Sequence, residues 1–82
     1  MREKIIDEIV QIIKSKFSRN EVDIKEELLG RNLNFMPVEL AILLKELENI
    51  YKIDFDEKDI LNGLFNNIYN ISALIEDKIN FN

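Results

Sequence analysis

A long apolar run after the only proline of the chain constrains the fold more than any other feature. Proline suits the first turn of a helix, where its missing N–H is no loss, and it biases Met36 away from helical angles. We therefore expect a helix from Pro37 to Tyr51 or Lys52, with Asn34 as a candidate cap. Apolar residues occupy three sides of this segment, which predicts that the helix lies at the centre of a bundle.

Two further segments show the three- and four-residue spacing of apolar side chains that is typical of amphipathic helices. The first spans residues 2–17. The last is expected to be capped by Asn66 or Asn67, and its apolar face consists of Ile68, Ile71, Leu74, Ile75 and Ile79. Residues 18–33 lack this periodicity, so they predict a long loop in which Gly30 permits a turn with positive φ.

A short third helix is expected after Asp56, which can cap it. Its apolar residues are Ile60, Leu61 and Leu64, and Gly63 is placed to end it. The sequence therefore predicts an all-α four-helix bundle with a long first loop and a short third helix. A chain of 82 residues makes one domain, residues 1–82.

The acidic residues Asp54, Asp56, Glu57 and Asp59 superficially resemble a calcium-binding loop. The sixth position from Asp54 is Asp59, where that loop needs glycine, and the twelfth is Phe65 instead of glutamate. We therefore expect these side chains to cap backbone groups and face water, and we expect no metal site.

Composition narrows the function classes. The formal net charge of −5 would repel a phosphate backbone and favours a basic protein partner, although the excess acid could equally serve solubility alone. Cysteine, histidine, threonine and tryptophan are absent, and serine occurs only at Ser15, Ser18 and Ser72. A histidine-based nucleophile–base pair is therefore impossible, and we expect a protein that is not an enzyme.

Without a recognisable leader or an apolar run that could span a bilayer, we expect a cytoplasmic location with no membrane contact.

Several short motifs resemble the acyl and peptidyl carrier proteins, and together they cover nearly the whole chain. The matching residues are Leu29-Gly30, Val38-Glu39-Leu40, and Leu47-Glu48 followed by Tyr51 and Phe55. The resemblance implies an acyl-carrier-like four-helix fold, but the serine that carries phosphopantetheine in that family is missing. One alignment places Asn34 at the serine position and the other places Pro37 there. Neither side chain offers a nucleophilic oxygen, so no cofactor is expected.

A narrower resemblance points to the small acyl-carrier-related proteins of bacterial peptide-maturation and bacteriocin gene clusters, which lack the attachment serine. The shared features are Pro37, Glu39-Leu40 and the stretch from Gly63 to Phe65, with Val38 and Leu64 as intervening residues. This resemblance implies an accessory or docking protein in peptide or natural-product maturation.

By analogy with carrier proteins, the docking residues would be Glu39, Glu46 and Glu48, which would meet a basic patch on a partner enzyme. Two alternatives stay open. The chain could be a functioning acyl carrier with an atypical attachment residue, or a structural protein that self-associates through apolar residues including Leu40, Leu43 and Leu44. We expect a monomer in preference to a dimer.

Overall fold

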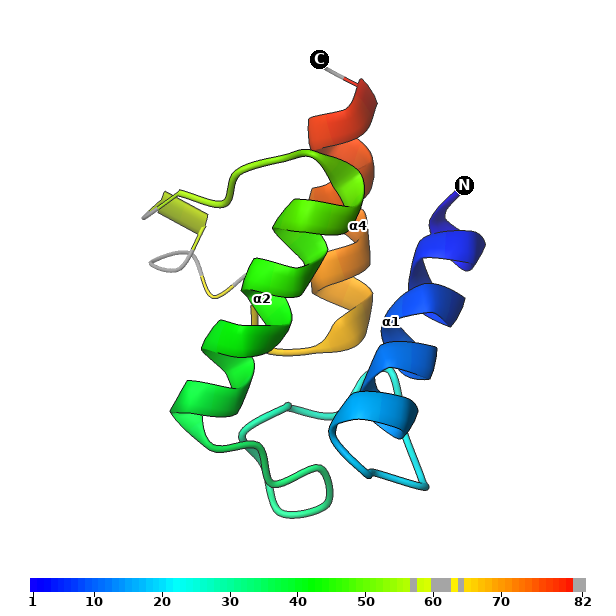
Figure 1. Cartoon of the computed structure of the whole chain (residues 1–82), viewed down its shortest axis with the longest axis vertical. Helices are drawn as coiled ribbons and strands as arrows, with labels where there is room; N and C mark the ends of the chain where they lie inside the picture. Colours follow the sequence, from blue (N-terminus) through cyan, green and yellow to red (C-terminus); the bar gives the residue numbers. More distant parts are fainter. Residues whose placement is uncertain (57, 60–62, 64, 81–82) are drawn as a thin grey trace.

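The structure, a computed structural model, describes residues 1–56, 58–59, 63 and 65–80. Three helices joined by loops make up this part of the chain. They are α1 (Arg2–Lys16), α2 (Pro37–Tyr51) and α4 (Ile68–Asn80). Figure 1 shows α1 running in the opposite direction to both α2 and α4. No strand occurs in these ranges, so the described chain is a small all-α fold.

The predicted four-helix bundle is wrong, because the described residues contain three helices. Asp56 and Asp59, which belong to the expected short helix, form a single turn in which each carboxylate accepts the backbone N–H of the other. The described residues of the expected helix, Asp56, Lys58, Asp59 and Gly63, contribute no apolar side chain to the core. The apolar residues expected in that helix, Ile60, Leu61 and Leu64, lie outside the described residues.

The main helix pair consists of α1 and α4, whose apolar stripes face each other. Arg2 joins the outer edges of the two helices, because its guanidinium donates to the hydroxyl of Tyr69 at 3.1 Å and to the carboxylate of Glu76 at 3.0 Å. The buried isoleucines of this pair are Ile5, Ile9, Ile12, Ile13, Ile68, Ile71 and Ile75. Both helices were expected from their spacing, and both are confirmed.

The bounds predicted for the central helix are confirmed. It begins at Pro37 and ends at Tyr51, and Lys52 follows in the left-handed conformation with φ of 58°. Met36 precedes the first turn in an extended conformation, and it is the N-cap in place of the expected Asn34. At the start of α4 the expected cap is present, because the side-chain oxygen of Asn67 accepts the N–H of the residue three positions later at 2.7 Å.

The predicted central position of α2 is wrong. Its buried side chains are Leu43 and Leu47, while Val38 and Ile42 face solvent. The reason is that α1 and α4 together supply half of the buried core residues that the structure describes and the loops supply most of the rest, so α2 buries a single stripe against them. None of the three described helices has the length and apolar character that a bilayer crossing requires.

The long first loop is pinned to the start of α4 by backbone hydrogen bonds. The N–H of Leu28 donates to the carbonyl of Asn66 at 2.8 Å, and the N–H of Tyr69 donates to the carbonyl of Ile24 at 3.0 Å. The loop also sends three side chains into the core, Leu28, Leu33 and Phe35. The predicted long loop is therefore confirmed, and it is anchored to the core, although Leu29 points outward.

Gly30 does not supply the positive φ expected of it, because the positive angles of this region fall on Ser18 (58°) and Asn34 (49°). The space at position 30 favours glycine for another reason. A Cβ there would lie 3.0 Å from the carbonyl oxygen of Glu27, closer than real Cβ atoms comfortably approach.

Candidate functional site

The two positions where a carrier protein would hold its attachment serine lie at the start of α2. Asn34 is exposed, and its backbone is held in a turn by its N–H, which donates to the carbonyl of Gly30 at 2.8 Å. Pro37 is also exposed, as the first residue of the helix. Both positions therefore reach solvent, but neither presents a hydroxyl to a transferase.

Arg19 fastens this region to the end of α1. Its guanidinium donates to the carbonyls of Phe17 at 2.7 Å, Leu33 at 2.9 Å and Asn34 at 3.0 Å. It also donates to both oxygens of Glu39, at 2.8 and 2.9 Å. No sequence pattern predicted this network, because its partners come from three separate segments. A paired arrangement of two parallel bonds between arginine and carboxylate is the geometrically most specific form of ion pair. The start of α2 is therefore fixed to the first loop and to the end of α1 through Arg19.

Ser18 lies beside this region and lines the same hollow as Arg19 and Asn34, whereas the other two serines lie elsewhere. Ser72 is fully buried in α4, and its hydroxyl donates to the carbonyl of Tyr69 at 2.7 Å. Ser15 is exposed on α1, where its hydroxyl donates to the carbonyl of Gln11 at 2.8 Å. Ser18 is exposed just after that helix.

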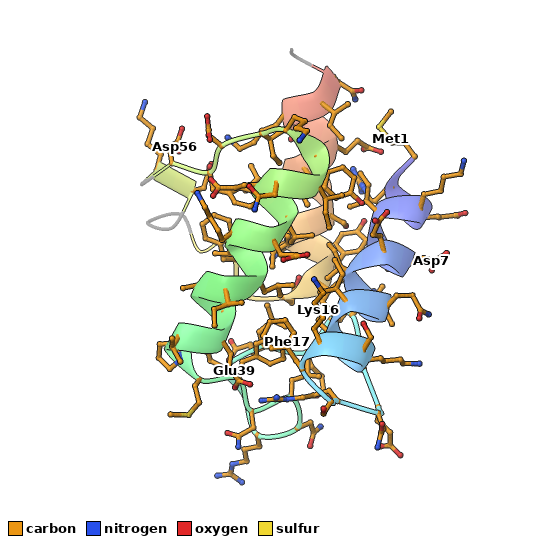
Figure 2. The ribbon with its side chains drawn as sticks, viewed as in Figure 1. Met1, Asp7, Lys16, Phe17, Glu39 and Asp56 are labelled. Carbon is orange, nitrogen blue, oxygen red and sulfur yellow. The ribbon has the colours of Figure 1, made fainter. Side chains whose placement is uncertain are left out.

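The three predicted docking carboxylates are engaged within the protein and do not form one acidic surface. Glu39 is held by Arg19 and also accepts the N–H of Met36 at 2.9 Å; these bonds, led by those from Arg19, keep the pKa of the Glu39 carboxyl below its ordinary value. Glu46 pairs with Lys16 of α1. Figure 2 shows Lys16 on the side of α1 that faces α2, and Glu39 near Phe17 at the base of α2.

Glu48 lies on the other flank of α2. One of its oxygens accepts the backbone N–H of Phe55 at 2.9 Å, and the other lies 3.9 Å from the ammonium of Lys45. The Glu48 side chain is only 20% exposed and already accepts a backbone N–H, so it is poorly placed to meet a partner's cation. The prediction that Glu39, Glu46 and Glu48 bind a basic patch therefore gains no support from their geometry.

The side of α2 that faces solvent is apolar over its first two turns. Val38 is 63% exposed and Ile42 is 54% exposed, one helical turn apart, and Met36 before the helix is 59% exposed. Leu29 of the loop, 53% exposed, stands beside the same end of the helix. We call these four residues together with the exposed Ala41 the outward apolar face. The sequence contains the signal for it, but apolar residues of this spacing were interpreted as core.

A groove opens beside the outward apolar face. It has a volume of about 330 Å³ and an almost wholly apolar lining, which consists of Leu29, Pro37, Leu40, Ala41, Leu44, Gly63, Phe65 and Asn66. Leu40 and Leu44, two of the residues proposed for self-association, line this groove, whereas the third, Leu43, is fully buried in the core. Leu43 therefore cannot contribute to an interface in the folded chain.

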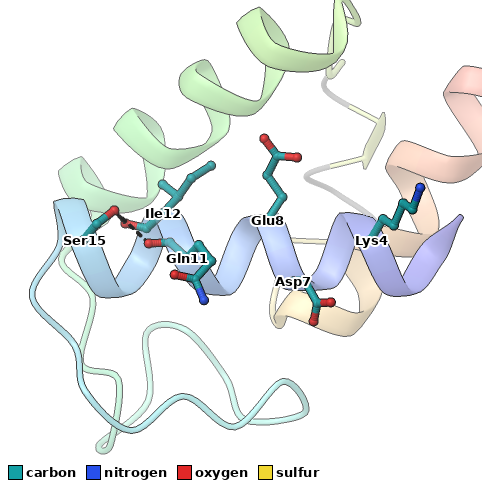
Figure 3. A pocket seen from close by; sticks show the side chains of 6 residues that line it. All are labelled: Lys4, Asp7, Glu8, Gln11, Ile12 and Ser15. Atoms are coloured by element: carbon teal, nitrogen blue, oxygen red, sulfur yellow. Dashed lines mark hydrogen bonds between the residues drawn. The ribbon is translucent and has the colours of Figure 1, made fainter.

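A second hollow, of about 530 Å³, lies along α1 and is lined by Lys4, Asp7, Glu8, Gln11, Ile12 and Ser15. In Figure 3, Glu8 and Ile12 point toward α2, whereas Asp7 points away. The hydroxyl of Tyr51 donates to the carboxylate of Glu8 at 3.4 Å. Burial, followed by the charge of Glu8, raises the pKa of Tyr51 to about 12. The hydroxyl therefore stays protonated at neutral pH and links α2 to α1 through Glu8.

The acidic turn after α2 caps backbone groups as expected, but Asp59 is buried instead of facing water. Asp56 accepts the N–H of Asp59 at 3.3 Å, and Lys78 of α4 lies 3.3 Å from the Asp59 carboxylate. Burial acts to raise the pKa of Asp59, but the N–H of Asp56 and the ammonium of Lys78 together hold it below its ordinary value. In the described part of the chain no three acidic side chains converge as metal ligands would, and Glu57 lies outside that part.

Comparison of the sequence with models of known protein families, with curated proteins and with solved structures finds no match. The functional interpretation therefore depends on the geometry of the outward apolar face and its groove.

Proposed function

We propose that the protein is a binding module without catalytic activity of its own, and that it docks a protein partner through the outward apolar face. The observation that carries this proposal is the exposure of large apolar side chains together at one end of α2, each of them more than half exposed. Single exposed apolar residues are ordinary on protein surfaces, whereas a contiguous apolar patch is typical of an interaction site.

The surroundings of the patch support a protein partner. The groove beside it is open and apolar, so it suits an inserted side chain, and the polar groups that flank α2 are already hydrogen-bonded within the chain. Binding there would remove apolar surface from water without desolvating an unpaired charge, which is the usual composition of an interface core. The pathway that we propose, peptide or natural-product maturation, depends on the sequence motifs alone.

Photo-crosslinking in living cells tests the proposal. A photoreactive phenylalanine derivative is placed at Ile42, and in a matched control at Lys14, which is exposed on α1. We expect a defined protein adduct from position 42 and none from position 14. The adduct should disappear in Val38→Asp, a substitution that the fold tolerates because Val38 is exposed and acidic residues are favourable in the first turn of a helix.

Two results would contradict the proposal. Equal adducts from both positions would show that the outward apolar face has no special role. An adduct that contains only a second copy of the chain would replace docking by self-association.

A further inference from the structure

We infer that the partner presents an amphipathic helix whose apolar side chains insert into α2 and whose acidic residue meets Lys45. This inference depends on the proposed function, because it names the kind of partner that the outward apolar face would bind. It follows from the spacing of the exposed residues on α2 and from the charge beside them.

The first argument is geometric. When helices pack, a side chain of one helix enters a hole formed by four residues of the other, at positions i, i+3, i+4 and i+7. The α2 residues that line the groove are Pro37, Leu40, Ala41 and Leu44, which have this spacing. The groove is therefore a ready-made hole for one side chain, and its outer walls are Leu29 of the loop and Phe65.

A second hole of the same kind adjoins the first. It is formed by Val38, Ala41, Ile42 and Lys45, again at i, i+3, i+4 and i+7, and all four residues are exposed. The two holes share Ala41, whose small side chain leaves both of them open and lets a partner backbone approach closely. The two holes are offset by one residue, so they lie side by side around α2, about 100° apart, and a partner helix that crosses α2 at a steep angle can present one apolar side chain to each.

The second argument is electrostatic. The Lys45 side chain is 74% exposed, and it supplies the charge of the second hole. Its neighbour Glu48 is 3.9 Å away and already accepts the backbone N–H of Phe55 through its other oxygen. A partner carboxylate placed over Lys45 would therefore find an accessible ammonium, and this complementarity would fix the partner's register on α2.

The same charge opposes binding of a second copy. In an antiparallel pair of α2 helices centred on Ala41, Lys45 of one copy would lie near the start of the other helix, which carries partial positive charge. In a parallel pair, Lys45 would lie against its own equivalent, and like charges at that separation repel. The face therefore fits a different protein better than a second copy of this chain.

Synthetic peptides added to the full-length ¹⁵N-labelled chain test the inference by NMR. One helical peptide carries leucines along a single face and glutamates elsewhere. A second has lysines in place of the glutamates, and a third has the composition of the first with its leucines spread around the helix. We expect the first peptide to shift the amide signals of Ala41, Ile42 and Phe65 saturably, and to bind more tightly than the other two.

The preference for the glutamate peptide is a sharp expectation, because the net charge of −5 alone would favour the lysine peptide. Measuring at about 0.15 M salt limits that long-range contribution, since screening then acts beyond about 8 Å. Lys45→Glu should reverse the preference between the two charged peptides, by roughly fivefold in affinity.

Filling the holes provides the matched comparison. Ala41→Phe should weaken the glutamate peptide by roughly tenfold or more, because it occupies both holes. Lys14→Phe adds the same side chain at an exposed position of α1, away from the holes, and should leave affinity unchanged. Circular dichroism of both variants confirms that the helices are intact.

Equal affinity for the peptide with spread leucines, or signal shifts confined to α1, would overturn the inference. The two proposals fail separately. If position 42 crosslinks to a protein but no helical peptide binds, the docking function stands and the helical, acidic partner is wrong. If position 42 yields no protein adduct either, both are wrong.

Discussion

Truncation of two adjacent residues of α2 should change the free energy of unfolding to very different extents. Leu43 is fully buried, so Leu43→Ala removes buried apolar surface and leaves a cavity, at a cost of about 2–5 kcal/mol in the free energy of unfolding. Ile42 is 54% exposed, so Ile42→Ala should change that free energy by about 0.5 kcal/mol or less. The comparison holds the helix, its neighbours and the replacement residue constant.

The expected difference is large on the scale of this protein. At roughly 0.05–0.15 kcal/mol per residue, a chain of 82 residues has a free energy of unfolding of about 4–12 kcal/mol. A loss of about 3 kcal/mol from Leu43→Ala would lower the melting temperature by about 12–24 °C. Urea denaturation followed by circular dichroism measures both variants directly. If Ile42→Ala costs about 2 kcal/mol or more, Ile42 packs inside the protein and the reasoning about a free face is refuted.

Three further predictions follow from the local chemistry. Ionised Glu39 stabilises the fold through Arg19, so its contribution is complete above the unfolded carboxyl pKa of about 4.3 and is lost as pH falls through the lower folded pKa. Glu39→Gln should therefore flatten the decline of the urea midpoint below about pH 5. An unchanged decline would contradict the pairing. Tyr51 ionises with a pKa of about 12, above the unfolded value of about 10, so its contribution to stability is lost as pH rises between those values. Tyr51→Phe should remove the step near pH 12 from an ultraviolet titration of tyrosinate. A step that persists would mean that another group causes it. The intact mass should stay unchanged after coexpression with a broad-specificity phosphopantetheinyl transferase, because Ser72 is buried and the start of α2 has no hydroxyl; a gain of one phosphopantetheine would direct the search to Ser18.

Local signals predicted the helices well. Apolar spacing located α1 and α4, Pro37 marked the start of α2, and Asn67 marked the start of α4. Each of these signals acts within one or two turns of chain, so the sequence contains it directly. The same reasoning failed for the short third helix, where a predicted cap formed but three helices, not four, make up the described chain.

The candidate site depended on contacts between distant segments, which periodicity cannot show. Ile42 and Leu43 are adjacent and equally apolar, and only the packing of α1 against α4 decides which of them is buried. Glu39 looked like a docking residue because its partner, Arg19, lies 20 positions earlier in an irregular loop. The sequence therefore directed attention to α2, but the exposed apolar side of this helix became evident only in the structure.

The most direct test of the account compares the affinity of the crosslinked partner for two variants of α2 by isothermal titration calorimetry. Ile42→Asp alters the outward apolar face, whereas Glu46→Gln removes one of the carboxylates first expected to dock, with its pair to Lys16. The account predicts that Ile42→Asp weakens binding by roughly tenfold or more and that Glu46→Gln changes it by less than about threefold. A strong loss for Glu46→Gln with little change for Ile42→Asp would show that the partner binds the acidic flank, and would contradict the account.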